Sequence, residues 1–336
     1  MRLSESLRKK IVVTGAGRII NRLKVPRVYV LFFEEILANY IKECENRGYV
    51  NDKDIGKLWM YNIDRFIPSA LKRLPVSIFF NRFLNRIWTN IGGVENIRAS
   101  KEGDIITIKT KREFVTRIIG KNDFFVGVLE GIINALCKCE SECIRKTQAI
   151  NSCTYVFRLK KGYYRPAKCK NKNLYNSLNN SSQVKGFDLK SGIKKGIFTI
   201  KPDNKIYFRG NVLIPIENTL FHLLSNRRLL IGKVSSISYD FFRKYVDKNT
   251  SKEAKLTLLK NIMQVSGWGT VNIKMEKDGV LVHIRNMPYG LQTEKDNWEF
   301  LVRTILGYLW IVDRKYLTKK VDVSRNALRI KYCTRA

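Results

Sequence analysis

The chain has 336 residues, of which 44% are hydrophobic, so it is long enough for two domains and can bury an apolar core. It contains 63 lysines and arginines against 29 acidic residues, and its formal net charge is +34. Positive charges in such excess repel one another unless an anion neutralises them. It therefore excludes an ordinary near-neutral domain and favours a nucleic acid, an anionic membrane surface or a polyanionic protein as the partner.

Residues 1–24 form a basic arm, in which Glu5 is the single acid. Such arms commonly lie along phosphate backbones. The segment "VVTGAGR" (12–18) has two glycines of a dinucleotide-binding turn, but Ile20 occupies the third glycine position, which favours a loop. No long apolar run precedes a cleavage site, so we predict no secretory signal, and no stretch is long enough for a transmembrane segment.

Residues 25–160 show helical and strand patterns in a fixed order. An extended entry, "RVYVLFF", leads into amphipathic helices at about 33–46, 54–72 and 76–89. Apolar residues then alternate on both sides of a Lys-Glu-Gly-Asp turn, which predicts a hairpin. The apolar segment "DFFVGVLEGIINALCKC" predicts a buried helix, and "CTYVFRLKK" predicts a closing strand.

Residues 161–204 form a basic connector, and its Asn/Ser-rich part (171–183) cannot bury a core and should be flexible. Between Arg158 and Lys185 the chain has no acid, and Tyr163 and Tyr164 interleave with cations. Cations can neutralise phosphates while tyrosine rings stack on unpaired bases. The alternative is a solubilising linker. The predicted nucleic-acid contacts here are Lys160, Lys161, Tyr163, Tyr164, Arg165, Lys168, Lys170 and Lys172.

Residues 205–336 repeat the plan of residues 25–160, with helices at about 216–225, 232–247 and 251–266 and a hairpin at Asp278-Gly279. A displacement of 176 positions lays Gly93 on Gly269 and Gly131 on Gly307. The matches fall on glycines and apolar residues, which determine turns and cores. We interpret the chain as two diverged copies of one α+β domain, each with helices on a small antiparallel sheet and related by a pseudo-two-fold axis.

The stretches "GGVENI…FFVGVLEGIINALCKCESEC…CTYVF" and "YFRGNVLIP…SGWGTVNI…VHIRNMPYG" resemble the 4-vinyl reductase domain, which is similar in fold to subunits of TRAPP trafficking complexes. The resemblance implies small-molecule sensing or regulation, with a small hydrophobic ligand, and a domain that is not itself a catalyst. It also implies that the cysteines of the first copy bind a metal or a thiol-reactive ligand. The second copy has Asp313, Arg314 and Lys319 in that region.

The cysteines that match this region are Cys137, Cys139, Cys143 and Cys153, and four thiolates can bind Zn²⁺ tetrahedrally. Their spacing is not that of a standard zinc finger, and the alternative is a set of ordinary thiols. The chain has seven cysteines, an odd number, which favours reduced thiols and a cytoplasmic location over a disulfide scaffold.

A further basic set, "KTKREFVTRIIGK" (109–121), follows the first hairpin. We expect Lys109, Lys111, Arg112, Arg117 and Lys121 to project from that edge of the sheet, with an ordinary solvated face as the alternative. Of these, Lys109, Lys111 and Arg112 are predicted nucleic-acid contacts. A similar basic set lies in the C-terminal region, around "DRKYLTKK" (313–320).

Candidate catalytic groups are scarce. The two histidines, His222 and His283, both lie in apolar settings that favour structural roles. Clustered carboxylates for a two-metal nuclease are missing, so we predict no enzyme activity. The cations are dispersed along the chain, which fits a large, shape-defined polyanion. The first hypothesis is a protein that binds structured RNA or the ribosome. DNA is the second choice of nucleic acid. The alternatives are a ligand-responsive DNA-binding regulator and a trafficking or membrane adaptor.

Overall fold

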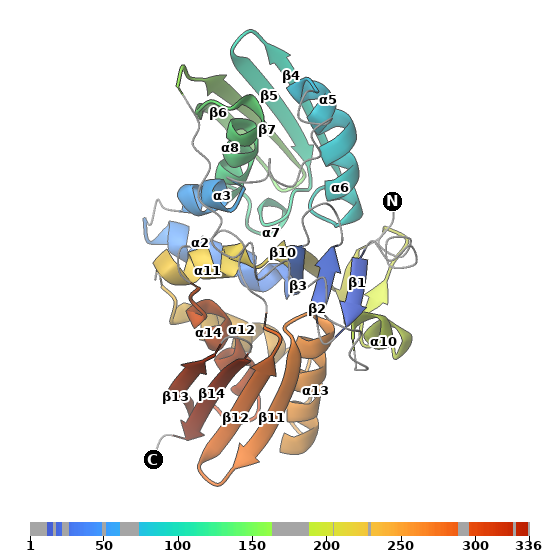
Figure 1. The fold of residues 1–336 in the computed structure, drawn as a ribbon, viewed down its shortest axis with the longest axis vertical. Coiled ribbons are helices and arrows are strands. Elements are labelled where there is room, and N and C mark those ends of the chain that lie inside the picture. Colours follow the sequence, from blue (N-terminus) through green and yellow to red (C-terminus); the bar gives the residue numbers. More distant parts are fainter. Residues whose placement is uncertain are drawn as a thin grey trace.

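The computed structural model describes residues 12–15, 18–21, 27–48, 52–60, 74–162, 188–203, 205–227, 230–287, 296–324 and 327–334. Figure 1 shows an elongated molecule with a six-stranded sheet across its middle and a four-stranded sheet toward each end. The strands that pair in these sheets run antiparallel. The architecture is therefore α+β, which confirms the predicted fold class.

The central sheet contains strands from both halves of the chain. Its order is β1 (Val12–Gly15), β2 (Arg18–Asn21), β3 (Arg27–Phe33), β10 (Asn211–Glu217), β9 (Ile206–Phe208) and β8 (Thr199–Ile200). At its centre β3 pairs antiparallel with β10, and Phe33 lies opposite Leu213. The entry strands of the two predicted copies are thus joined by backbone hydrogen bonds.

The side chains of β3 pack on helices from the far half of the chain. The Phe33 ring lies 4.7 Å from Phe241 and 5.3 Å from Phe242, between ring centroids, and the Phe32 ring lies 5.0 Å from Phe221. Residues 30–33 are buried on both faces of the strand, as the unbroken apolar run "VLFF" predicts. The two predicted domains therefore share one hydrophobic core.

The first half places its own four-stranded sheet beside helices. The strand order is β4 (Asn96–Glu102), β5 (Ile105–Lys111), β7 (Ser152–Leu159) and β6 (Ser141–Gln148). The helical elements of this half are α2 (Glu34–Asn46), α3 (Asp52–Met60), α5 (Val76–Ile78), the π-helical turn η2 (Phe79–Leu84), α6 (Asn85–Asn90), α7 (Thr116–Ile119) and α8 (Phe124–Cys137). Helices α5, α6 and α8 and the turn η2 contact the sheet, and the Phe125 ring of α8 lies 6.3 Å from the Tyr155 ring of β7.

The second half repeats this strand order in a separate sheet: β11 (Thr270–Glu276), β12 (Gly279–Arg285), β14 (Ala327–Thr334) and β13 (Tyr316–Val323). Its helices are α10 (Leu189–Lys194), α11 (Thr219–Arg227), α12 (Lys233–Phe242), α13 (Lys252–Val265) and α14 (Glu299–Leu309). The buried Tyr332 hydroxyl of β14 donates to the Val302 carbonyl of α14 at 3.0 Å. Among the described helices, none combines the length and apolar character that crossing a bilayer requires.

Glycines allow one helix pair in each half to pack unusually closely. A Cβ atom on Gly127 of α8 would lie 1.8 Å from the Lys53 carbonyl oxygen of α3, and one on Gly307 of α14 would lie 2.3 Å from the Ser235 carbonyl oxygen of α12. Only glycine permits backbones to approach so closely. The α3–α8 and α12–α14 pairs therefore share one packing device.

The edge strands β6 and β13 of the end sheets are among the strands that the sequence pattern did not predict. Each lies at the edge of its sheet, and the middle of β6 is exposed. The period-2 apolar alternation that reveals a half-buried strand is therefore weak in both.

Elements also occur in the predicted basic arm and connector. Strands β1 and β2 form a hairpin within residues 1–24, where we expected a loop at 12–18. Within the predicted connector (161–204), helix α10 buries Leu189, and Phe198 is also buried. The Asn/Ser-rich part lies outside the described residues.

Candidate nucleic-acid interface

The four-stranded sheet of the first half has one open face. Ile106, Ile108 and Thr110 of β5 point inward and are buried, whereas Lys109 and Lys111 point outward and are exposed. This alternation is what an antiparallel strand imposes when helices cover one face of its sheet. The structure therefore places the two predicted lysines about 7 Å apart on the outer face.

Two cations lie directly opposite one another on this face. Arg98 of β4 pairs in register with Lys109, and both side chains are exposed. Like charges directly opposite on a sheet are destabilising. In the part of the chain that the structure describes, neither cation has a carboxylate within ion-pair distance.

Hydroxyl and cationic groups extend the face across β7 and β6. Lys109 lies opposite Thr154, and Lys111 lies opposite Ser152. Arg145 of β6 lies opposite Val156, which points outward from β7 together with the exposed Arg158. We call this surface the first basic face; it consists of Asn96, Arg98, Ser100, Glu102, Ile105, Thr107, Lys109, Lys111, Glu142, Arg145, Thr147, Ser152, Thr154, Val156 and Arg158.

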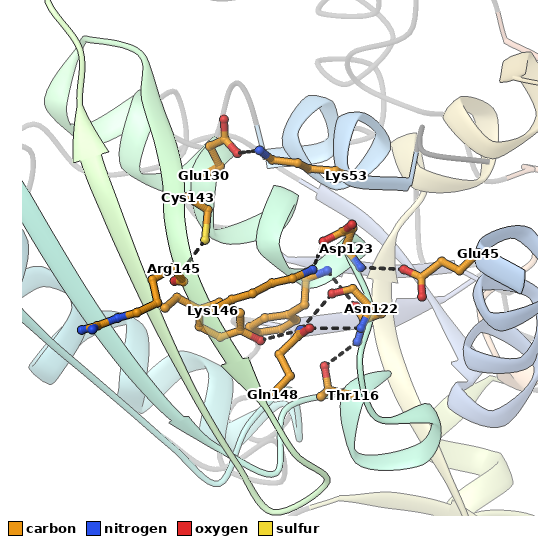
Figure 2. A network of polar contacts seen from close by, with 12 residues as sticks. Glu45, Lys53, Thr116, Asn122, Asp123, Glu130, Cys143, Arg145, Lys146 and Gln148 are labelled. Atoms are coloured by element: carbon orange, nitrogen blue, oxygen red, sulfur yellow. Dashed lines mark hydrogen bonds and ion pairs between the residues drawn. The ribbon is translucent and has the colours of Figure 1, made fainter. Parts of the chain in front are cut away.

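Consecutive residues of β6 point to opposite faces of the sheet, one toward the first basic face and the next toward the interior. Figure 2 shows Arg145 and Lys146 leaving the strand in opposite directions, with Lys146 reaching Asp123. Lys146 is thereby engaged in an ion pair, while Arg145 is directed away from it. A basic residue in the sequence is therefore available to a partner only when the strand alternation places it outward.

Other predicted contacts are engaged within the protein or lie elsewhere. Arg112 donates from Nε to Glu95 Oε1 at 3.1 Å, and Lys160 forms an ion pair with Glu142 at 2.7 Å. Lys161 is exposed. The predicted residues outside the described part of the chain are Tyr163, Tyr164, Arg165, Lys168, Lys170 and Lys172.

Arg117 does not project from the edge of the sheet, so this expectation was wrong. Its guanidinium forms an ion pair with Glu34 of α2, and the two side chains are only 6% and 2% exposed. Glu34 also accepts a hydrogen bond from the Val115 backbone N–H at 3.0 Å. The sequence neighbourhood is basic, but the turn after β5 directs this one cation into the core.

The sheet of the second half has a comparable outer face. His283 of β12 lies opposite Arg329 of β14, and neither they nor Arg285 forms an ion pair within the described residues. Burial, followed by the charges of Arg329 and Arg285, lowers the pKa of His283. The second basic face consists of Thr270, Asn272, Lys274, Glu276, Leu281, His283, Arg285, Lys320, Asp322, Arg329 and Lys331, with Asp322 opposite Arg329.

The structure shows the surroundings of Lys331 and of the two histidines of the second half. Lys331 is neutralised, because Glu276 lies 3.0 Å and Asp278 3.3 Å from its amine. His283 is half-exposed on the outer face. His222, by contrast, is fully buried and accepts a hydrogen bond at Nδ1 from the Asn297 N–H at 3.0 Å, in agreement with a structural role.

The structure does not bring the four predicted zinc ligands together. Cys143 lies opposite Phe157 and Cys153 lies opposite Gln148, so these two cysteines are about 13 Å apart along the strand pair. The Cys153 thiol donates to the Ala149 carbonyl at 3.3 Å. Cys137 ends α8, and Cys139 follows Lys138, a left-handed helix cap. Among the described residues no group of three or more metal-binding side chains is placed around one ion.

The environment of these thiols favours their protonated form. Burial raises the pKa of Cys137 and of Cys153 to about 11. Burial also raises the pKa of Cys139 and of Cys143. Thiolates are the form that binds metals and reacts, so these side chains behave as neutral thiols near pH 7.

Comparisons with protein-family models, with characterised proteins and with solved structures found no match to this chain. The resemblance to 4-vinyl reductase domains accordingly remains a prediction from the sequence.

Proposed function

We propose that the protein binds a structured nucleic acid, with RNA as the preferred partner, and that the first basic face contacts its phosphates. The observation that carries this proposal is the opposition of Arg98 and Lys109, two exposed cations in register with no carboxylate within ion-pair distance among the described residues. The repulsion costs stability in the isolated protein. A phosphate placed between the two side chains converts that repulsion into two charge-assisted hydrogen bonds.

The surrounding groups suit phosphate and sugar contacts. Serine and threonine hydroxyls flank the lysines of β5, and such side chains commonly donate to phosphate oxygens. The first basic face, as defined above, contains no aromatic side chain, whereas proteins that bind single strands stack bases on aromatic rings. These features support a folded or double-stranded partner that is recognised by shape.

Structured RNA is preferred to DNA because basic surfaces occur at more than one place. The first and second basic faces belong to the two end sheets of an elongated molecule (Figure 1), and the connector adds further cations in the sequence. A compact folded RNA or a ribosomal surface can meet several such sites at once. The stretch from Lys160 to Lys172, where the connector begins, is proposed as a second contact.

The test measures RNA affinity as a function of salt. Fluorescence anisotropy with a labelled structured RNA should show weaker binding as salt rises, because phosphate contacts release counterions. The double variant Lys109→Gln/Lys111→Gln should lower the slope of log affinity against log salt by about 1–2. The matched control, Lys42→Gln/Lys233→Gln, removes the same charge from exposed positions on α2 and α12 and should change the slope much less.

Three outcomes would contradict the proposal. One is the absence of saturable binding to RNA at low salt, and another is equal slopes for the two double variants. The third is tighter binding to duplex DNA of equal length, which would make DNA the partner. Glutamine substitutions between Lys160 and Lys172 test the connector separately; an unchanged slope would reject it as a contact.

A further inference from the structure

A small cavity opens where four segments of the first half meet. It lies between the C-terminal end of α2, the start of α3, the turn before α8 and strand β6, and has a volume of about 210 Å³. Pockets for drug-sized ligands begin at about 300 Å³, so this cavity suits a smaller molecule. Its charged and polar lining consists of Glu45, Asp52, Lys121, Asn122, Asp123 and Lys146.

One carboxylate oxygen at this cavity has no hydrogen-bond donor among the described residues. Asp52 is 1% exposed, and within the described structure its Oδ2 atom has no hydrogen-bond partner. Buried polar atoms are almost always hydrogen-bonded, and an unpaired buried carboxylate oxygen is costly. The cavity beside Asp52 is therefore a position where a donor from outside the chain would be stabilised.

The charges around Asp52 indicate which charge an external hydrogen-bond donor should carry. Burial, then the charges of Glu45 and Asp123, raise the pKa of Asp52 to about 7. Lys146 is engaged by Asp123, and Lys121 is exposed at the cavity wall. In the described part of the chain, no cation forms an ion pair with Asp52 or Glu45. The charges that act on Asp52 are thus those of Glu45 and Asp123, while the two lysines of the cavity wall are paired with Asp123 (Lys146) or exposed (Lys121).

Glu45 is held in place beside this carboxylate. Its Oε1 atom accepts a hydrogen bond from the Asp123 backbone N–H at 2.6 Å (Figure 2). Burial and the charge of Asp123 raise the pKa of Glu45. Two carboxyl groups from different helices are therefore fixed at one cavity, and a single cation between them would relieve the repulsion of both.

We propose that this cavity binds the ammonium group of a small organic amine, with the carboxylates of Asp52 and Glu45 as its acceptors. An ammonium has three N–H donors and no acceptor, which matches a site where the Asp52 Oδ2 atom has no hydrogen-bond partner among the described residues. A metal ion fits less well, because the described residues hold no group of three or more metal-binding side chains around one point. The proposal concerns a different surface from the basic faces and does not depend on nucleic-acid binding.

The experiment is a calorimetric titration of the full-length protein at pH 8 and low salt with 1,4-diaminobutane, with propylamine, and with 1-propanol as the uncharged analogue. Saturable one-to-one binding is expected for the amines and none for 1-propanol. Asp52→Asn and Glu45→Gln should each weaken binding at least tenfold. Asp54→Asn is the matched control, since Asp54 is exposed on the same helix, and its affinity should equal that of the wild type.

Lowering the pH provides a test that needs no variant. Affinity should fall between pH 8 and pH 6, because protonation of Asp52 removes one acceptor charge. The proposal is overturned if no amine binds saturably, if Asp52→Asn and Glu45→Gln both bind as the wild type does, or if Asp54→Asn loses as much affinity as they do. Titration with Mg²⁺ completes the test: saturable Mg²⁺ binding without amine binding would overturn the proposal in favour of a metal site.

Discussion

Arg98 and Lys109 lie directly opposite one another on neighbouring strands of a solvent-exposed sheet face. Reversing either charge turns the repulsive pair into an attractive one, so Arg98→Glu and Lys109→Glu should each raise the free energy of unfolding by roughly 0.2–1 kcal/mol. The double reversal restores like charges and should remove the gain. Urea denaturation measures all three variants.

The same single variants should weaken RNA binding, because each removes a proposed phosphate contact. A variant that is more stable and binds less well is expected where a surface is kept for function at the expense of stability. If the single reversals gain stability but bind RNA with unchanged affinity, the first basic face is an ordinary solvated surface.

The Glu34–Arg117 ion pair should contribute to stability through its burial. Arg117→Met leaves the Glu34 carboxylate buried without its cation and should cost about 3–5 kcal/mol. Arg112→Met is the control, since its ion pair with Glu95 is about half exposed and should be worth at most about 1 kcal/mol. Equal urea midpoints for the two variants would show that burial does not distinguish these ion pairs.

Asp52 should make stability fall as the pH rises. Its pKa is raised from 3.8 to about 7 in the folded protein, so between these values the folded state retains a proton that the unfolded state has lost. The contribution of Asp52 to the free energy of unfolding is therefore largest below about pH 4 and declines as the pH rises to about 7. Relative to Asp52→Asn, the wild type should lose stability over this window.

Urea denaturation of both proteins at pH 5, 6, 7 and 8 tests this expectation. The difference in unfolding free energy between wild type and variant should change steadily up to pH 7 and then level off. A constant difference across the series would mean that Asp52 ionises normally in the folded protein.

The glycine contacts between helices should not tolerate a methyl group. Gly127→Ala places its Cβ atom against the Lys53 carbonyl oxygen, and Gly307→Ala does the same at Ser235. Each substitution should lower the free energy of unfolding by about 1–3 kcal/mol or more, because α3 or α12 must move away from its partner helix. Gly232→Ala is the control, since nothing lies within 4 Å of the added atom. Thermal unfolding that shows three equal midpoints would contradict this packing argument.

The elements with strong local signals could be predicted from the sequence. The hairpins β4–β5 and β11–β12 have alternating apolar residues and glycine-containing turns, and both occur as predicted. Helix α8 is apolar around most of its circumference and is buried almost throughout. Strands β6 and β13 could not be predicted in this way, because an edge strand with exposed polar residues lacks the pattern that burial imposes.

The candidate interface was only partly predictable. Lys109 and Lys111 follow from the alternation of β5, which separates outward from inward residues. The pairing of Arg98 with Lys109 depends on strand register, and the addition of Arg145 depends on the unpredicted β6. Arg117 shows the converse, because a cation in a basic stretch of sequence is buried against a carboxylate 83 positions away.

The sequence by itself determined the α+β class, the recurring order of elements and the surplus of positive charge, since these depend on local periodicity and on composition. Only the tertiary structure decided that β3 and β10 join the halves around one core, which cations face outward together, and that Asp52 meets Glu45 and Asp123 at one cavity. These relationships are decided by contacts between residues far apart in the chain. Local sequence patterns carry no information about which distant side chains will share a face, a core or a cavity.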